Sequence, residues 1–454
     1  MKVVVIGLDC LEPSLVFEKY SEHLPNFRRL REKGLWGRME STIPPITIPA
    51  WASMVTGKLP GTLGFYGFRN RKDYSYEKLA FATSNYLKEK TIWDYLTERG
   101  KRSIVIGVPP SYPPKPLNGI LISCFLTPST DSPFTYPEEV KSFILEHFGD
   151  YMFDVKKFRT EDKDWLLSQV YRLTEQRFAV ARYFLENEEW DFFMMVDMGP
   201  DRFHHGFWKF FDPEHVKYEP GNKYENSGIE YYKFLDEKLG EFLDAVPQGA
   251  FVFVVSDHGA KRMDGGIVVN EFLIKEGYLK LKSHPSGIFK LEEAEVDWDH
   301  TVAWGEGGYY SRIFLNVKGR EPRGVIPPED YEKVREELKQ KLEEITDEEG
   351  RNIGTKVYKP EEIYPEIKNI PPDLIVLFGD LYWRAIGTMG YGTLWSREND
   401  TGPDDANHAM HGTFIMYPVD NPHEVSLHIT DVAGTILKLF DIEPEGNFYG
   451  KSII

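Results

Sequence analysis

The chain has 454 residues, of which 41% are hydrophobic and 28% are charged, a composition typical of a folded globular protein and not of a disordered chain. Its formal net charge of −18 argues against broad nonspecific binding to nucleic acid, because that affinity comes mainly from Lys and Arg. With two cysteines, Cys10 and Cys124, the sequence excludes a disulfide scaffold and a cysteine-rich zinc site.

The apolar run near the N-terminus, Val3–Leu8, is too short to be a signal peptide, and no stretch of the chain reaches the roughly 18 apolar residues of a membrane span. We therefore expect a cytoplasmic protein that does not enter a membrane.

Short, fully apolar runs alternate with helical patterns through the first half of the chain. In chain order the predicted elements are strand Val3–Leu8, a helix around Ile92–Arg99, strand Ser103–Val108, a helix over about Asp164–Glu188, strand Phe192–Val196, helix Ile229–Ala245 and strand Ala250–Val255. Continuous apolar strands that alternate with helices are typical of a parallel sheet buried on both faces. The sequence thus predicts an α/β fold with a doubly wound, mostly parallel sheet.

The pattern changes over residues 262–400, where Gly, Pro and charged clusters mix. This segment contains one clear helix and two isolated strand candidates, Pro328–Ile345, Arg312–Val317 and Leu374–Phe378. We predict an inserted cap or accessory region that partly returns to the core. Residues 1–261 and 401–454 then form the core, which ends with strand Gly412–Tyr417 and helix His428–Leu439.

Acidic residues follow three of the apolar runs. Asp9 follows the first strand, Asp257 and His258 follow the run that ends at Val255, and Asp201 and His205 come shortly after the run that ends at Val196. Ligands of open α/β sheets bind at the carboxyl ends of the strands, so these groups can meet at one edge. Any one Asp could be an ordinary turn former, but crowded carboxylates repel one another unless cations lie between them. Mixed Asp and His ligands favour zinc or manganese.

Thr47 is the candidate nucleophile, because a helix-like stretch, Pro49–Thr56, follows it at once. The alternative is that Thr47 is only the N-cap of this helix. In the functional interpretation, the free N–H groups of the helix N-terminus hold a phosphoryl group, and a metal activates the hydroxyl. Late in the chain, His408 and His411 are both candidate ligands.

Together these residues resemble the type I phosphodiesterase/nucleotide pyrophosphatase family of the alkaline phosphatase superfamily. The resemblance rests on the aspartate after the first strand, on the threonine before a short helix, and on three motifs: Pro200-Asp201-Arg-Phe-His-His205, Ser256-Asp-His-Gly259 and Asn407-His408. It spans Met1 to about Lys261 and about Asp404 to the end.

The resemblance implies an alkaline phosphatase-like core and two divalent metal ions, most simply zinc. One metal would be held by Asp9, Thr47, Asp257 and His258, and the other by Asp201, His205 and His408. His408 is preferred over His411 because the family's histidine lies four positions before a glycine, here Gly412. The family resemblance further implies hydrolysis of a phosphodiester or nucleotide pyrophosphate through a phospho-threonine, with a small phosphorylated substrate such as a nucleotide.

One position departs from the family pattern. The family's diesterases place Asn after the Pro, where it helps to hold a phosphate oxygen, and here Ala50 stands there. In place of this Asn, a positively charged side chain would have to hold the phosphate oxygen. We consider Arg69 and Lys261 first, and Arg71 and Arg262 are further candidates. Two other functions stay open: a phosphomutase or phosphotransferase of the same superfamily, and a homologue that binds metal or ligand without catalysis.

Overall fold

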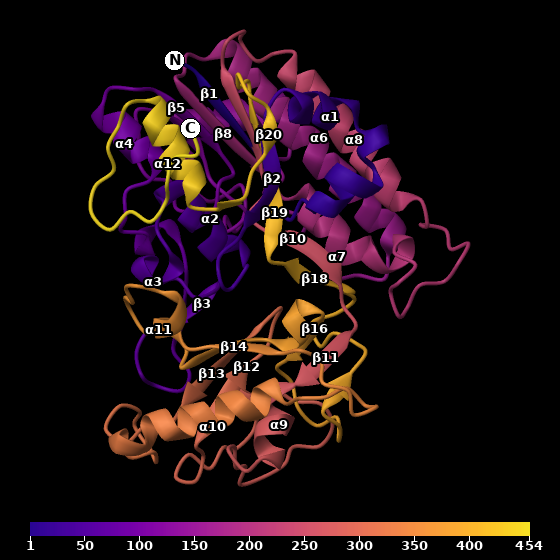
Figure 1. Ribbon diagram of the computed structural model, residues 1–454, viewed down its shortest axis with the longest axis vertical. Helices are drawn as coiled ribbons and strands as arrows, with labels where there is room; N and C mark the ends of the chain where they lie inside the picture. Colours follow the sequence, from indigo (N-terminus) through magenta and orange to yellow (C-terminus); the bar gives the residue numbers. More distant parts are fainter.

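The computed structural model describes residues 1–454 and divides into two parts (Figure 1). The larger part, at the top of the figure, is built on one central sheet and contains both chain termini. The smaller part, which we call the accessory unit, covers residues 265–396 and lies below it.

The central sheet has ten strands and is mostly parallel, which confirms the predicted α/β class. Its antiparallel members are β19, inserted between β2 and β9, and the edge strand β7. The strands in spatial order are β20 (His423–Glu424), β2 (Leu35–Glu40), β19 (His411–Tyr417), β9 (Phe251–Val255), β1 (Val3–Leu8), β8 (Phe192–Asp197), β5 (Ser103–Ile106), β6 (Gly119–Ile122) and β7 (Thr135–Tyr136), with β21 (Leu427–His428) also paired to β2.

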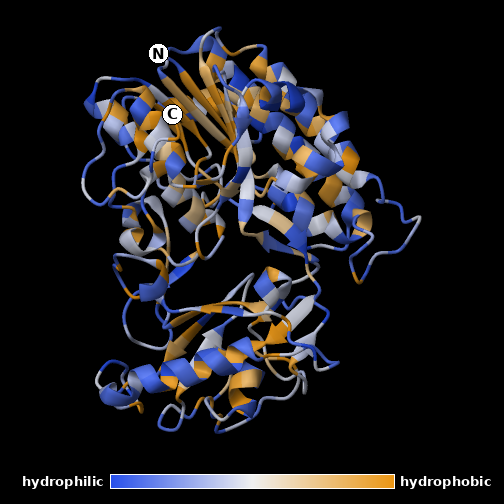
Figure 2. Ribbon diagram, viewed as in Figure 1, coloured by the Kyte–Doolittle hydropathy of each residue, from blue (hydrophilic) through white to orange (hydrophobic).

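Helices cover both faces of this sheet. One group packs together on the right of Figure 1: α1 (Pro25–Glu32), α6 (Lys163–Asn187), α7 (Gly199–Phe211) and α8 (Ser227–Leu243). The other lies on the left: α2 (Thr47–Thr56), α3 (Pro60–Leu63), α4 (Ile92–Glu98) and α12 (Asp431–Leu439). Strands β1, β5 and β8 are buried along their whole length, which is why they read as unbroken apolar runs and appear orange in Figure 2.

The accessory unit has its own sheets and its own hydrophobic core. Helix α10 (Tyr331–Glu343) buries Leu338 and Leu342 in that core, and its charged side chains other than the buried Arg335 are half-buried or exposed. The unit contains a four-stranded sheet of β12 (Ala303–Glu306), β13 (Ser311–Leu315), β15 (Leu374–Leu377) and β14 (Lys356–Tyr358), a three-stranded sheet of β16 (Trp383–Ile386), β11 (Gly265–Val268) and β17 (Trp395–Ser396), and helices α9 (Val269–Lys275) and α11 (Pro360–Ile363).

A two-stranded antiparallel ribbon joins the two parts. Strand β10 (Gly259–Arg262) begins directly after His258, and it pairs with β18 (Ala406–Ala409) in a register that sets Ala260 opposite His408. The ribbon thereby brings a histidine from near the end of the chain to the carboxyl end of β9. No helix in the structure combines the length and apolarity needed to cross a membrane.

Candidate two-metal site

The carboxyl ends of β1 and β9 place Asp9 beside Asp257. The two strands are parallel neighbours, with Gly7 paired to Val255, so the residues that follow them leave the sheet at the same edge. The backbone N–H of Cys10 donates to Asp257 Oδ1 at 3.1 Å, which ties the two strand ends together. Both carboxylates are fully buried.

Helix α7 contributes Asp201 and His205. The two residues are four positions apart and so lie on one face of the helix, with Asp201 Oδ1 3.3 Å from His205 Nε2. Both were expected shortly after the strand that ends near Val196, and they lie within the first two turns of the helix that follows β8.

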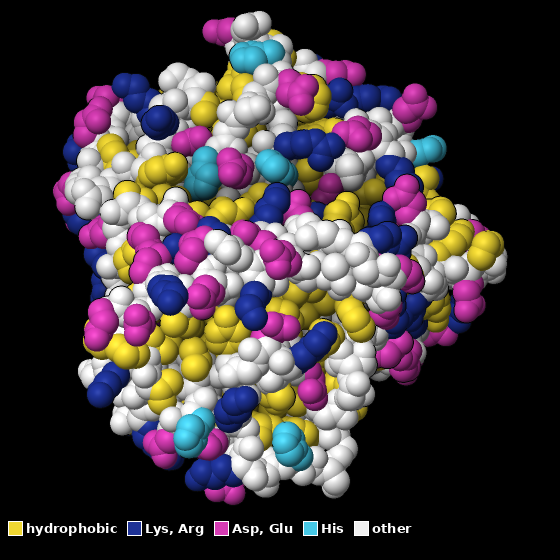
Figure 3. All heavy atoms as spheres, turned by 60° about the horizontal axis from the view of Figure 1, so that its bottom comes forward, with side chains coloured by type: hydrophobic (Ala, Val, Ile, Leu, Met, Phe, Trp, Pro, Cys, Tyr) yellow, Lys and Arg dark blue, Asp and Glu magenta, His cyan; other side chains and the backbone are white.

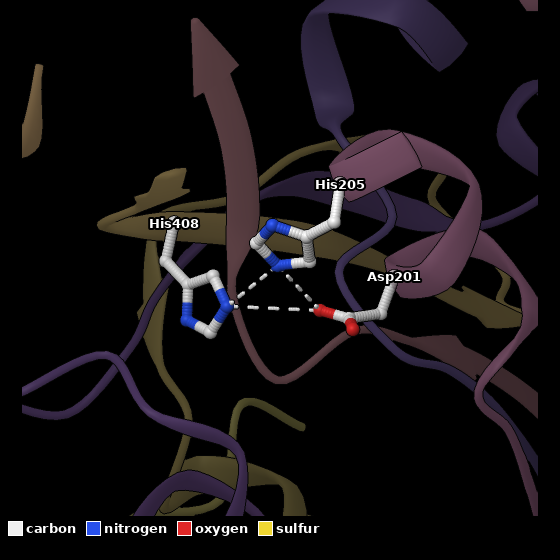
Figure 4. Close-up of side chains that lie close together, drawn as sticks. All are labelled: Asp201, His205 and His408. Carbon is white, nitrogen blue, oxygen red and sulfur yellow. Dashed lines mark hydrogen bonds and ion pairs between the residues drawn. The ribbon is translucent and has the colours of Figure 1, made fainter. Parts of the chain in front are cut away.

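His408 completes a buried trio with these residues (Figure 4). Its Nε2 lies 3.2 Å from His205 Nε2 and 3.6 Å from Asp201 Oδ1. The Nδ1 of His408 lies 2.7 Å from the carbonyl oxygen of Pro45, which can only accept, so this nitrogen carries the proton of the neutral ring. A neutral His408 therefore points an Nε2 lone pair at the other two side chains, as a metal ligand does.

His258 is oriented in the same way beside the first trio. Its Nδ1 donates to the Gly259 carbonyl at 3.0 Å, and its Nε2 lies 3.1 Å from Asp257 Oδ2 and 3.8 Å from Asp9 Oδ1. The His258 ring stacks on that of His408 at a centroid distance of 3.7 Å. Two groups of ligands thus lie side by side.

The carboxylates of this cluster carry oxygens without partners. Asp9 Oδ1, Asp201 Oδ1 and Asp257 Oδ2 are buried and accept no hydrogen bond, although nearly all buried polar atoms are paired in folded proteins. Burial raises the pKa of Asp9 well above its ordinary value, and the charges of Asp257 and Asp201 raise it further. Cations would relieve both the repulsion and the missing contacts, so these residues fit two divalent metals. The candidate metal groups are Asp201, His205 and His408, and Asp9, Asp201 and His258.

Thr47 is the first residue of α2, not its N-cap. The N-cap is Ile46, whose side chain makes no capping bond, so the N-cap interpretation of Thr47 is wrong. The Thr47 hydroxyl lies 3.5 Å from His258 Nε2 and therefore faces the cluster. The first N–H groups of α2 have no partner within the helix and point toward this same end.

The chain also matches a known protein family. The family model of type I phosphodiesterases/nucleotide pyrophosphatases matches residues 3–413. The chain belongs to this family. A search of curated proteins finds no significant match.

Solved structures in this family share its fold. Mouse ectonucleotide pyrophosphatase/phosphodiesterase 5 matches with a TM-score of 0.58 and 14% identity, over 98% of this chain and 96% of that chain. The human protein, and an inactive threonine-to-alanine variant of the mouse protein in complex with AMP, match with the same TM-score at 13% identity, again over 98% of this chain and 96% of theirs.

Sequence reasoning missed two residues of the site. Each donates a hydrogen bond to the second carboxylate oxygen of an aspartate in the cluster. The indole Nε1 of Trp51 donates to Asp9 Oδ2 at 2.7 Å, and the guanidinium of Arg202 donates to Asp201 Oδ2 at 2.7 Å. Trp51 can approach because Gly7 has no side chain; a Cβ there would lie 2.7 Å from the indole ring. The available sequence signals were spacing alone, since Trp51 is one helical turn after Thr47 and Arg202 adjoins Asp201.

The structure does not bring the predicted substrate cations to the cluster. Arg69, in β3 (Arg69–Arg71), lies over the exposed ring of Phe81. Lys261 donates to the carbonyl of Asp380, and by strand alternation it points to the opposite face of the ribbon from Ala260 and His408. The remaining candidates also engage other residues: Arg71 pairs with Glu321, Arg262 with Asp264 and Glu214, and His411 lines a separate cavity.

His204, next to His205, points away from the cluster and bonds the hydroxyl of Tyr232 at 2.9 Å. Burial lowers its pKa to about 3, so the folded protein keeps it neutral. The unfolded chain, with a pKa near 6.5, binds this proton first, so the free energy of unfolding should fall as pH drops from 6.5 towards 3.

Because of His204, we expect the free energy of unfolding to fall by about 2 kcal/mol between pH 6.5 and pH 5. The measurement is denaturant unfolding of metal-free wild type and His204→Gln at several pH values in that range. The variant should show a flatter pH dependence; equal slopes in the two proteins would contradict the assignment.

Proposed function

We propose that the protein is a two-metal phosphodiesterase or nucleotide pyrophosphatase that works through a phospho-threonine on Thr47. The observation that carries the proposal is the Thr47 hydroxyl, placed at the N-terminus of α2 and 3.5 Å from His258 Nε2. His258 Nε2 in turn lies 3.1 Å from Asp257 Oδ2 and 3.8 Å from Asp9 Oδ1, two buried carboxylate oxygens that lack partners. In this proposal the nucleophile, the helix N–H groups that bind the phosphoryl group and the carboxylates that bind the cations belong to one site.

In this proposal Asp9, Thr47, Asp257 and His258 hold one metal, and Asp201, His205 and His408 hold the other. Zinc is the first candidate and manganese the second, because the ligand set mixes nitrogen and carboxylate oxygen. When bound, the metals supply a lowered hydroxyl pKa and positive charge at the reacting phosphate. The two ligand sets differ in that only the first contains a hydroxyl, that of Thr47.

The chain's own groups then carry the covalent steps. Thr47 Oγ1 gives up its proton to solvent and attacks phosphorus, and a bond from Oγ1 to phosphorus forms. The bond to the leaving-group oxygen breaks, and the leaving group departs with the electron pair and takes up a proton from solvent. The N–H groups of α2 bind the phosphoryl oxygens that gain charge. Water next cleaves the bond between Oγ1 and phosphorus, which releases a phosphate monoester and restores the threonine.

A small phosphorylated substrate, such as a nucleotide, suits this site, and AMP is the ligand in the complex of the mouse relative. Acidic and basic side chains are interspersed over the face seen in Figure 3, with small hydrophobic patches between them. This face shows no large patch of Lys and Arg that could attract a phosphorylated substrate, so recognition would depend on the site itself.

The decisive experiment strips the protein with a chelator, reloads it with zinc or manganese, and offers bis-p-nitrophenyl phosphate, p-nitrophenyl phosphate and a dinucleoside pyrophosphate. We expect hydrolysis only with metal, and faster turnover of the diester or pyrophosphate than of the monoester. Isomerisation of a sugar phosphate or phosphoglycerate without release of phosphate would instead identify a mutase. Metal binding without turnover of any substrate would indicate the non-catalytic alternative.

A further inference from the structure

A buried carboxylate, Asp404, lies behind His205 on the side away from the metal ligands. Its Oδ1 lies 2.8 Å from His205 Nδ1, and neither side chain is more than 1% exposed. We propose that Asp404 is a positioning residue for the second metal, and that the accessory unit, through Tyr309 and Arg384, is a working part of that metal site. This inference rests on the proposed two-metal function.

The contact between Asp404 and His205 decides which ring nitrogen faces the metal. A carboxylate can only accept, so the proton of a neutral His205 must be on Nδ1. Nε2 then presents its lone pair to Asp201 and His408. The Pro45 carbonyl does the same for His408, so both histidines of this trio are held in the ligating tautomer from behind.

The other oxygen of Asp404 is held by three donors from distant parts of the chain. Arg384 donates to Oδ2 at 2.9 Å, Arg159 at 3.1 Å and the hydroxyl of Tyr309 at 3.2 Å. Arg159 precedes α6 in the core, whereas Tyr309 lies between β12 and β13 and Arg384 lies in β16 of the accessory unit. The carboxylate is thereby fixed in place from both parts of the molecule.

Tyr309 also covers the metal-binding histidines directly. Its ring stacks on that of His205 at a centroid distance of 4.7 Å and on that of His408 at 4.3 Å. The guanidinium of Arg384 also lies over the tyrosine ring, 4.3 Å from its centroid. Arg384 is only 2% exposed, and such a burial is costly unless the charge is paired, as it is here with Asp404.

The principal test is Asp404→Asn, which keeps the size of the side chain and removes its charge. Zinc binding is measured by competition with a chelator of known affinity, together with zinc content by elemental analysis. We expect the zinc held by Asp201, His205 and His408 to bind about 10- to 100-fold less tightly and the other zinc to be unchanged. Wild-type affinity at both sites in a folded Asp404→Asn protein would overturn the proposal.

Asp405→Asn is the matched control. Asp405 is also buried and pairs with Lys209 at 3.1 Å and Lys217 at 2.7 Å, but its side chain touches no member of the cluster. The control should keep two zinc ions at wild-type affinity. An equal loss in both variants would mean that burial of charge in this segment stabilises the fold in general, and it would refute a specific role for Asp404.

Substitutions of Tyr309 test the accessory unit separately. Tyr309→Phe keeps the stacked ring and loses the hydroxyl, whereas Tyr309→Leu loses both, so zinc affinity should fall further in the leucine variant. If both variants bind zinc as the wild type does, the accessory unit has no part in the metal site. Because zinc binding is measured without substrate, a wild type that binds two zinc ions but hydrolyses nothing would refute the proposed function alone.

Discussion

Replacing Thr47 with alanine is expected to lower the rate of bis-p-nitrophenyl phosphate hydrolysis by at least about 10³-fold, because a covalent mechanism without its nucleophile retains only the binding and electrostatic contributions. The fold should survive, since Thr47 makes no capping bond and its hydroxyl contacts only His258. The measurement is kcat with zinc in excess, alongside the thermal unfolding of both proteins.

Thr47→Ser is the control for this experiment, because it keeps a hydroxyl at the same atom and should retain measurable turnover. Mass spectrometry of rapidly quenched protein should detect one phosphoryl group on wild type and none on the alanine variant. Hydrolysis by Thr47→Ala at the wild-type rate would rule out the threonine as nucleophile and with it the phospho-threonine.

The sequence predicted the strands of the core well because burial on both faces leaves an unbroken apolar run. Val3–Leu8 matches β1 residue for residue, and Ser103–Val108 overlaps β5. The sequence could not predict the order of the strands, because each apolar run looks alike and pairing is decided by tertiary packing. Strand β6 (Gly119–Ile122) was missed, since its four residues stand alone after a proline-rich stretch.

The site, like the fold, could be predicted only where it depends on local sequence and not on tertiary packing. Asp9, Asp257 and His258 could be placed at one edge because parallel strands share their carboxyl ends. Asp201 and His205 lie together because they are on one helix, and the spacing of their motif was not enough to predict that helix beforehand. Other partners, such as Asp404 and Tyr309 beside His205, come from segments that only folding brings near, and a single sequence carries no signal for those contacts.

The sequence predicted an inserted accessory region that partly returns to the core, without a role for it in the metal site. In the structure Tyr309 of this unit stacks on His205 and His408, two of the candidate metal ligands, and the strand that returns from the unit to the core carries His408. Substrate recognition and metal binding can therefore be coupled through this unit, and substitutions within it can alter both.

Asp201→Asn should have the second large effect. Asp201 belongs to both candidate metal groups, and its Oδ1 has no other partner, while Arg202 already occupies Oδ2. An amide in its place would keep the volume but remove a charge that lies within reach of both candidate metal positions. We expect at least one metal to bind about 100-fold less tightly or more, since loss of a ligand should exceed the loss of a residue behind one.

The diesterase activity of Asp201→Asn should fall with its metal content, and elemental analysis and kcat together measure the effect. Asp197→Asn provides the comparison, because Asp197 is an equally buried carboxylate at the end of β8 that bonds Thr174 and the N–H of Gly199 instead of the cluster. It should bind two metals normally even if its stability drops. Full metal occupancy and activity in Asp201→Asn would show that the two metals do not depend on this carboxylate, and the site would have to be rebuilt around Asp9 and Asp257.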